Sequence, residues 1–141
     1  MRKLCKLAFR LGFFAWLVIL LRLTVFRDGC FSNGWFSGEV VWVPFRFLAK
    51  LIRIRYWSYF LYLFLGNIFW FVPLGFAVRV WKGSFWKALL FGFLLSAFIE
   101  TAQFVLGSGV TEVEDLILNT SGACLGWLLA ASLRRITAQC S

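Results

Sequence analysis

Four long runs of apolar residues divide this chain, and short polar stretches separate them. The runs cover about residues 7–26, 56–80, 84–106 and 112–133. A helix rises about 1.5 Å per residue, so about 20 residues are needed to cross a hydrocarbon core of about 30 Å. The pattern therefore predicts an all-α, polytopic membrane protein with four transmembrane helices.

A shorter segment, residues 44–55, lies between the first and second runs. Its basic residues Arg46, Lys50 and Arg53 recur at steps of four and three, and apolar residues occupy the remaining face. Pro44 suits the first turn of a helix. The segment is too short and too charged to cross a membrane, which predicts a helix lying in the membrane surface.

Basic residues cluster beside particular ends of the apolar runs. They stand before the first run, between the second and third, and after the fourth: Arg2, Lys3, Lys6 and Arg10; Arg79, Lys82 and Lys87; Arg134 and Arg135. By the positive-inside rule, both termini are expected in the cytoplasm. No small-x-small cleavage site follows the first run, so we interpret it as a retained span.

The predicted surface helix departs from that rule, because its charges fall on the outer side. One explanation is a solvated basic face that contacts lipid headgroups. The other is that Arg46 turns inward and pairs with acids of the third and fourth runs. The sequence leaves both open.

Composition supports a membrane protein. The chain is 62% hydrophobic, with 18 Phe and 8 Trp, which argues against a soluble domain. A net charge of +9 could indicate nucleic acid binding, but the Lys and Arg residues flank apolar runs, so no nucleic acid partner is predicted. With no His and no CxxC, no metal or cofactor is predicted. Of the four cysteines, Cys5 and Cys140 are expected in the cytoplasm, Cys124 within a span and Cys30 alone outside, so no disulfide is expected.

Polar and small residues in the third and fourth runs recur at helical spacing. One face of each predicted helix carries Gly92, Ser96, Glu100 and Gln103 in the third and Asp115, Asn119, Gly122 and Gly126 in the fourth. An antiparallel pair hinged near residue 109 places Gln103 level with Asp115, Glu100 with Asn119, Ser96 with Gly122, and Gly92 with Gly126. This predicts a helical hairpin with a polar pocket near its turn and close small-residue contacts at its other end.

Two further polar features bear on that pocket. Asn67 lies in the middle of the second run, where an amide needs a partner, and the pocket is the expected supplier. Thr111 and Glu114 form a capping-box pattern, which gives Glu112 and Glu114 a structural explanation. Asp115 lies on the pocket face and stays a candidate site residue.

Four segments, VVWVPFRFL, GNIFWFVPLGF, SAFIETAQFVL and EVEDLILNTSGACLGWLL, resemble in order and spacing the VanZ-like family of small bacterial membrane proteins, over about residues 40–131. The matching positions are Pro44, Phe45 and Arg46; Asn67, Pro73, Leu74 and Gly75; Ser96, Glu100 and Gln103; Asp115, Asn119 and Gly122. Glu112 and Glu114 replace frequent aspartates, and Gly109 stands where many relatives carry a basic residue. The resemblance implies one VanZ-like domain over residues 1–141, in a bacterial plasma membrane, and a role in glycopeptide (teicoplanin) resistance.

Our hypothesis is that Gln103 and Asn119 hydrogen-bond Glu100, that Arg46 compensates its charge, and that the site receives a membrane lipid headgroup or a lipid-linked envelope precursor from the outer leaflet. The candidate binding residues are Arg46, Asn67, Ser96, Gln103 and Asn119. The alternative is an intramembrane enzyme on such lipids, with Glu100 and Asp115 as acid and base and an oxygen-liganded divalent ion. Against catalysis, the chain has no His and no recognised catalytic signature. A purely structural role is the third possibility.

Overall fold

The structure is a computed structural model that describes residues 2–26 and 34–139. Its elements in chain order are α1 (Arg2–Thr24), β1 (Glu39–Val41), α2 (Arg46–Arg53), α3 (Trp57–Val80), α4 (Phe85–Leu106), β2 (Val110–Glu112) and α5 (Val113–Gln139). Cys5 and Cys124 are free thiols. Cys30 and Cys140 lie outside the described residues.

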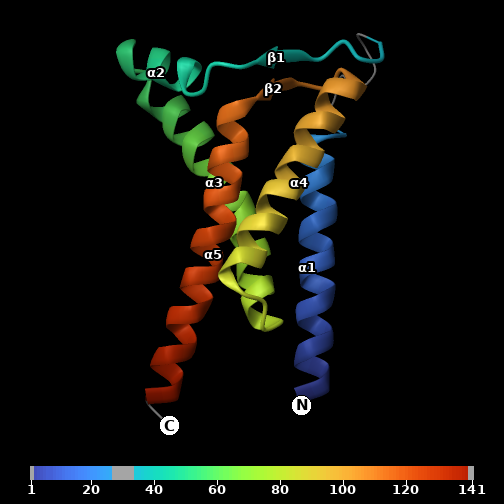
Figure 1. Cartoon of the computed structure of the whole chain (residues 1–141), viewed down its shortest axis with the longest axis vertical. Coiled ribbons are helices and arrows are strands. Elements are labelled where there is room, and N and C mark those ends of the chain that lie inside the picture. Colours follow the sequence, from blue (N-terminus) through green and yellow to red (C-terminus); the bar gives the residue numbers. More distant parts are fainter. Residues whose placement is uncertain (1, 27–33, 140–141) are drawn as a thin grey trace.

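The predicted fold class is confirmed. Helices α1, α3, α4 and α5 are long and apolar enough to cross a membrane, and the short α2 lies between the first and second of them. Helices α3 and α4 begin one residue after the predicted starts, whereas α1 begins earlier, at Arg2, and α5 continues to Gln139. Both termini lie at the same end of the bundle (Figure 1).

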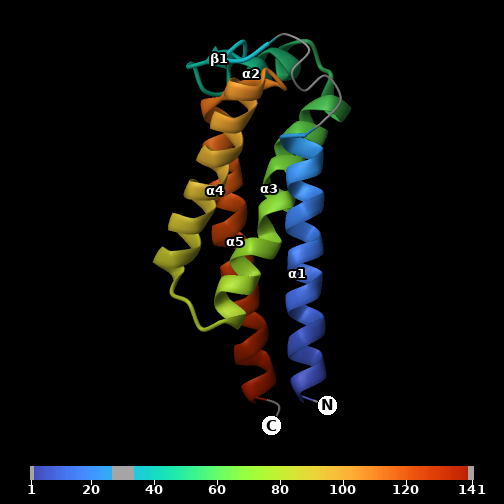
Figure 2. The ribbon, with the colours of Figure 1, turned by 90° about the vertical axis from the view of Figure 1, so that its right-hand side faces the viewer.

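Helix α5 is the central element of the bundle. It packs most extensively on α3 and next on α4, while α1 makes fewer contacts with the rest. Figure 2 shows α1 standing along one side of the other helices. The main apolar core lies between the helices and comprises Leu20, Val25, Phe71, Leu74, Ile99 and Ala123. A bundle organised by α5 brings residues of α3 and α4 to its two sides.

The small residues of α5 face α3. A Cβ at Gly122 would collide with the carbonyl oxygen of Ile68, and a Cβ at Gly126 with that of Val72. The predicted contacts of these glycines with Ser96 and Gly92 of α4 are therefore wrong. The physical reason is that the glycines allow the closest approach of backbones, and α3 rather than α4 occupies that position.

The register between α4 and α5 is also shifted from the predicted one. A Cβ at Gly92 would lie 2.7 Å from the Cβ of Ala123 and 3.4 Å from the Cα of Thr120. One turn further along α4, Ser96 meets Asn119, whose Nδ2 donates to the Ser96 Oγ at 2.9 Å. The helices still form an antiparallel hairpin, but each α4 residue faces α5 about three residues earlier than predicted.

A short parallel sheet, which the sequence did not predict, joins the two connections at the end opposite the termini. Strand β1 pairs with β2 in the register Glu39 to Val110 and Val41 to Glu112. Figure 1 shows the two strands lying across the top of α4 and α5. Thr111 belongs to β2, and its Oγ1 donates to the Glu100 carbonyl oxygen at 3.0 Å, so the predicted capping box does not form.

Substitution of the α5 glycines tests the packing on α3. Gly122→Ala and Gly126→Ala should each lower the free energy of unfolding by about 1–3 kcal/mol, because the new methyl group overlaps the α3 backbone. The measurement is thermal unfolding of the purified protein in detergent. Gly12→Ala is the control, since a Cβ there meets nothing within 4 Å. Equal losses at all three positions would contradict the described packing.

Candidate functional site

A cavity of about 470 Å³ lies inside the bundle, and all five helices and β2 contribute to its lining. Its lining includes four carboxylates and three amides: Glu100, Glu112, Glu114 and Asp115; Asn67, Gln103 and Asn119. These residues come from α3, α4, β2 and α5, so the cavity collects polar groups from three separate apolar helices. Five of these seven residues are candidate site residues in the sequence analysis: Glu100, Asp115 and the three amides.

The cavity lies near the sheet end of the bundle, with Phe47 and Leu48 of α2 among its lining residues. Figure 1 shows the α2 end of α3 well separated from α1, and their other ends closer together. Trp16 Nε1 of α1 donates to the carbonyl oxygen of Trp70 of α3 at 3.1 Å. Two lining residues with exposed side chains, Tyr62 at 72% and Leu23 at 54%, mark the rim between α3 and α1.

Asn67 finds its partner among the polar residues of the hairpin, as expected. Its Nδ2 donates a hydrogen bond to Asp115 Oδ1. Asp115 lies seven residues, or about two turns, before Gly122, so both occupy the face of α5 that packs on α3. The close helix contact made by the glycines therefore presents the Asp115 carboxylate to the amide of α3.

Glu100 is held by the connection between α4 and α5. It is 4% exposed, and its carboxylate accepts a hydrogen bond from the backbone N–H of Glu112 at 3.0 Å. Thr111 Oγ1 donates to the Glu100 carbonyl oxygen at 3.0 Å. Strand β2 thus fixes both the backbone and the side chain of Glu100. This partner was missed because short strands in connections leave no periodic signal in the sequence.

The amides expected to hold Glu100 have other partners. Gln103 Nε2 donates to the carbonyl oxygen of Thr24 in α1 at 3.1 Å, and Asn119 Nδ2 donates to Ser96 Oγ at 2.9 Å. The Gln103 Oε1 is buried without a hydrogen-bond partner among the described residues. Ser96 does not line the cavity but supports Asn119, which does. The hypothesis that Gln103 and Asn119 hydrogen-bond Glu100 is therefore wrong, since each amide has a closer partner.

Three carboxylates gather where β2 runs into α5. One oxygen of each of Glu112, Glu114 and Asp115 lies within 4.8 Å of the others. The Glu114 carboxylate also accepts a hydrogen bond from the backbone of Phe45. This arrangement offers the oxygen ligands that Mg²⁺ and Ca²⁺ prefer. The capping-box pattern in the sequence predicts a helix-capping role for Glu112 and Glu114. The run of three acids in four residues was the signal for a cluster.

The surroundings of Glu112 disfavour the ionised form of its carboxyl group. Burial raises the pKa of its carboxyl group above the usual value, and the nearby Glu114 carboxylate adds to the increase. Glu112 also repels the Asp115 carboxylate. The cluster is therefore electrostatically strained when all its members are ionised.

Arg46 does not take part in the cavity. It is the first residue of α2, its side chain is exposed, and it is not a lining residue. Within residues 2–26 and 34–139, no ion pair joins it to a carboxylate. The buried residues of α2 are Leu48 and Leu51, and Arg46 lies about 200° around the helix from Leu48. The inward ion pair with Glu100 is therefore wrong, because the apolar face of α2 turns inward instead.

Four apolar helices of spanning length, with a polar cavity near one end, define this chain as a multi-pass membrane protein. The family model described as VanZ/LLP1 matches residues 9–134, so the chain belongs to the VanZ/LLP1 family. The resemblance noted from the four sequence segments is thereby confirmed. A search of curated proteins and a search of solved structures gave no match.

The pH dependence of stability tests the environment of Glu112. A carboxyl group with a raised pKa in the folded state stabilises the fold at low pH and loses that contribution as pH rises through the raised pKa. Glu112→Gln should therefore unfold at a higher temperature than the wild type at about pH 8, and the difference should shrink toward about pH 4. Glu39→Gln, at an exposed position, is the control. A difference that grows on acidification would contradict the account.

Proposed function

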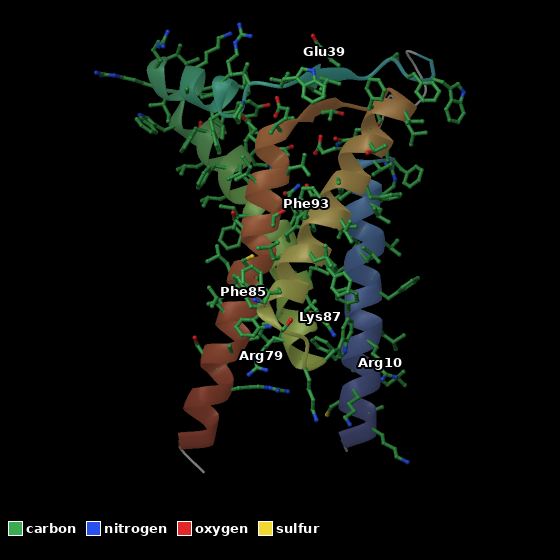
Figure 3. The ribbon with its side chains drawn as sticks, in the orientation of Figure 1. Arg10, Glu39, Arg79, Phe85, Lys87 and Phe93 are labelled. Carbon is green, nitrogen blue, oxygen red and sulfur yellow. The ribbon has the colours of Figure 1, made fainter. Side chains whose placement is uncertain are left out.

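We propose that the protein binds the headgroup of an envelope lipid, or of a lipid-linked envelope precursor, in this cavity. The cavity would open to the outer leaflet of a bacterial plasma membrane, with both termini in the cytoplasm. Figure 3 supports this orientation, because Arg10, Arg79 and Lys87 lie toward the end with the termini, and positive charge favours the cytoplasmic side. Glu100 is six residues before the end of α4, about 9 Å along the helix axis from that end.

The observation that carries this proposal is the set of carboxylates in the cavity. No Lys or Arg forms an ion pair with Glu100, Glu112, Glu114 or Asp115 within the described part of the chain. A charged carboxylate at membrane depth costs about 2.5–3.5 kcal/mol on insertion scales. Helix packing does not require buried carboxylates, since Gly122 and Gly126 bring α5 and α3 together without them. Polar groups of this kind mark a ligand site by default.

The lining fits a headgroup rich in hydrogen-bonding groups. The Asp115 carboxylate is oriented by Asn67, and the Glu100 carboxylate by the backbone of Glu112. Gln103 offers a buried acceptor, and Asn119 is fixed by Ser96. These groups form the wall, and the exposed Arg46 of α2 contacts phosphates at the membrane surface. The acyl chains would leave between α1 and α3, along the rim that Tyr62 and Leu23 mark.

We also propose a role in glycopeptide resistance, including resistance to teicoplanin, which the resemblance to the VanZ-like family implies. If lipid binding confers resistance, Glu100→Gln and Asp115→Asn should abolish the phenotype, because each removes a cavity carboxylate while keeping side-chain size. The measurement is the inhibitory concentration of teicoplanin for cells expressing each variant. Glu39→Gln is the matched control, because Glu39 is exposed and points away from the bundle (Figure 3). Full resistance in correctly inserted Glu100→Gln protein would refute the proposal.

Gly66 separates a binding role from a structural one. It lies in α3, lines the cavity, and a Cβ there meets nothing within 4 Å. Glycine inside a helix costs about 1 kcal/mol relative to alanine, so neither helix stability nor packing favours it. Gly66→Leu should leave the fold intact and lower lipid binding at least about tenfold by filling the cavity, a loss of about 1.4 kcal/mol.

Native mass spectrometry of lipids retained by the purified protein measures this effect. Gly12→Leu is the control, since Gly12 is equally open and lies in α1 away from the cavity. Unchanged lipid retention in Gly66→Leu would show that the cavity is not the binding site.

A second candidate function is catalysis on the same lipids. The observation in its favour is that Glu100 and Asp115 line one cavity and are both oriented by hydrogen bonds, as an acid and base pair requires. Incubation of the purified protein in lipid with labelled envelope lipids tests it. Chemical change that is lost in Asp115→Asn supports the enzyme, whereas intact lipid leaves the binding protein.

A further inference from the structure

The sign of charge in the cavity indicates what kind of headgroup it takes. Among the described residues, the lining includes four carboxylates and no Lys or Arg. When ionised, Glu100 and Asp115 repel each other, and so do Glu112 and Glu114. A cationic group in the cavity relieves both, whereas an anionic group increases them. The lining therefore selects for positive charge.

The wall contributed by α3 gives a second, independent indication of a cation. Tyr59, Tyr62 and Trp70 line the cavity from this side. The rings of Tyr59 and Tyr62 are stacked with centroids 6.2 Å apart. Aromatic faces attract ammonium groups through the ring quadrupole. A cavity of about 470 Å³ is also larger than a site for a bare metal ion.

The unpartnered amide oxygen of Gln103 indicates an N–H donor. Gln103 lines the cavity, is only 8% exposed, and its Oε1 has no hydrogen-bond partner in the described chain. Its Nε2 is already occupied by the Thr24 carbonyl oxygen. A buried acceptor left without a donor costs free energy. A primary ammonium can donate to this oxygen and to carboxylates at the same time.

The basic face of α2 lies next to the acidic cluster. The backbone of Phe45 hydrogen-bonds the Glu114 carboxylate, and Arg46 follows directly. Arg46, Lys50 and Arg53 are exposed, and α2 also supplies Phe47 and Leu48 to the cavity lining. A phosphate at the membrane surface can therefore meet these basic side chains while a group attached to it enters the cavity.

We propose that the cavity is selective for a lipid whose phosphate carries a primary ammonium group, as in an aminophospholipid. The ammonium lies between the carboxylates and the tyrosine wall and donates to Gln103 Oε1, and the phosphate stays with the basic side chains of α2. This proposal rests on the proposed lipid-binding function and names the substrate class of the same site.

The test compares lipids that differ only in the amine. The full-length protein in nanodiscs is titrated with phosphatidylethanolamine, its N-acetylated form, and phosphatidylglycerol, and bound lipid is measured by native mass spectrometry. We expect phosphatidylethanolamine to bind at least about tenfold more tightly than the other two. Glu112→Gln and Glu114→Gln should reduce this preference, while Glu39→Gln, an exposed acid outside the cavity, should retain it.

The outcomes separate this proposal from the one on which it depends. Equal binding of all three lipids would overturn the selectivity and leave the lipid-binding function standing. Binding of none would overturn both this proposal and the binding of an envelope phospholipid in the cavity. Binding that requires a divalent cation, is lost on chelation and ignores the amine would show that the carboxylates hold a metal ion, which also overturns the selectivity. The comparison on the wild-type protein decides the matter even if a variant fails to fold.

Discussion

A carboxylate inside a membrane must be paired with a cation, hydrogen-bonded or protonated, because lipid offers it no partner. The site depends on how this chain meets that requirement. Asn67 reaches from α3 to Asp115 on α5, and the backbone of β2 reaches Glu100 on α4. The partners therefore come from elements other than those that carry the acids. The polar end of the bundle is therefore built jointly by α3, α4, α5 and the sheet.

Different parts of α5 provide the close helix contact and the carboxylate of the cavity. Toward its carboxyl end, Gly122 and Gly126 allow the backbone of α3 to approach closely. On the same face but nearer its start, Asp115 meets Asn67 and the helices enclose a cavity. One helical face thus brings two helices into contact and, two turns away, presents a carboxylate between them. The glycines set the close contact between the helices, and the Asp115 carboxylate adds a hydrogen bond to Asn67 two turns away.

Much of this arrangement could be predicted from the sequence, for identifiable reasons. Apolar runs of spanning length predict transmembrane helices because lipid tolerates few alternatives. Asn67 could be assigned a partner in the hairpin because an amide at that depth needs one. The shared face of Glu100 and Gln103 followed from helical periodicity, and both line the cavity.

Other features depend on contacts that a periodic pattern does not encode. The helical hairpin predicted from the sequence considers only two helices and therefore pairs the glycines of α5 with α4. In the structure, a third helix, α3, makes the closer contact with them. The three-residue strands carry no alternation long enough to detect, yet β2 supplies the hydrogen bond to Glu100. Glu112 and Glu114 fitted a capping explanation, which hid the cluster they form with Asp115. Arg46 could be placed only once the buried face of α2 was known.

The same end of the molecule carries both signs of charge. The exposed basic residues of α2 face the surroundings, and the carboxylates face the cavity beneath. This arrangement of charge suits the proposed ligand, an amphiphile with a phosphate and a positively charged group.

The most direct measurement is a high-resolution structure of the full chain in a nanodisc containing phosphatidylethanolamine. The account predicts headgroup density in the cavity, within hydrogen-bond distance of the Glu100 or Asp115 carboxylate, with Asn67 still bound to Asp115. A cavity without lipid, or carboxylates turned outward to the acyl chains, would contradict it.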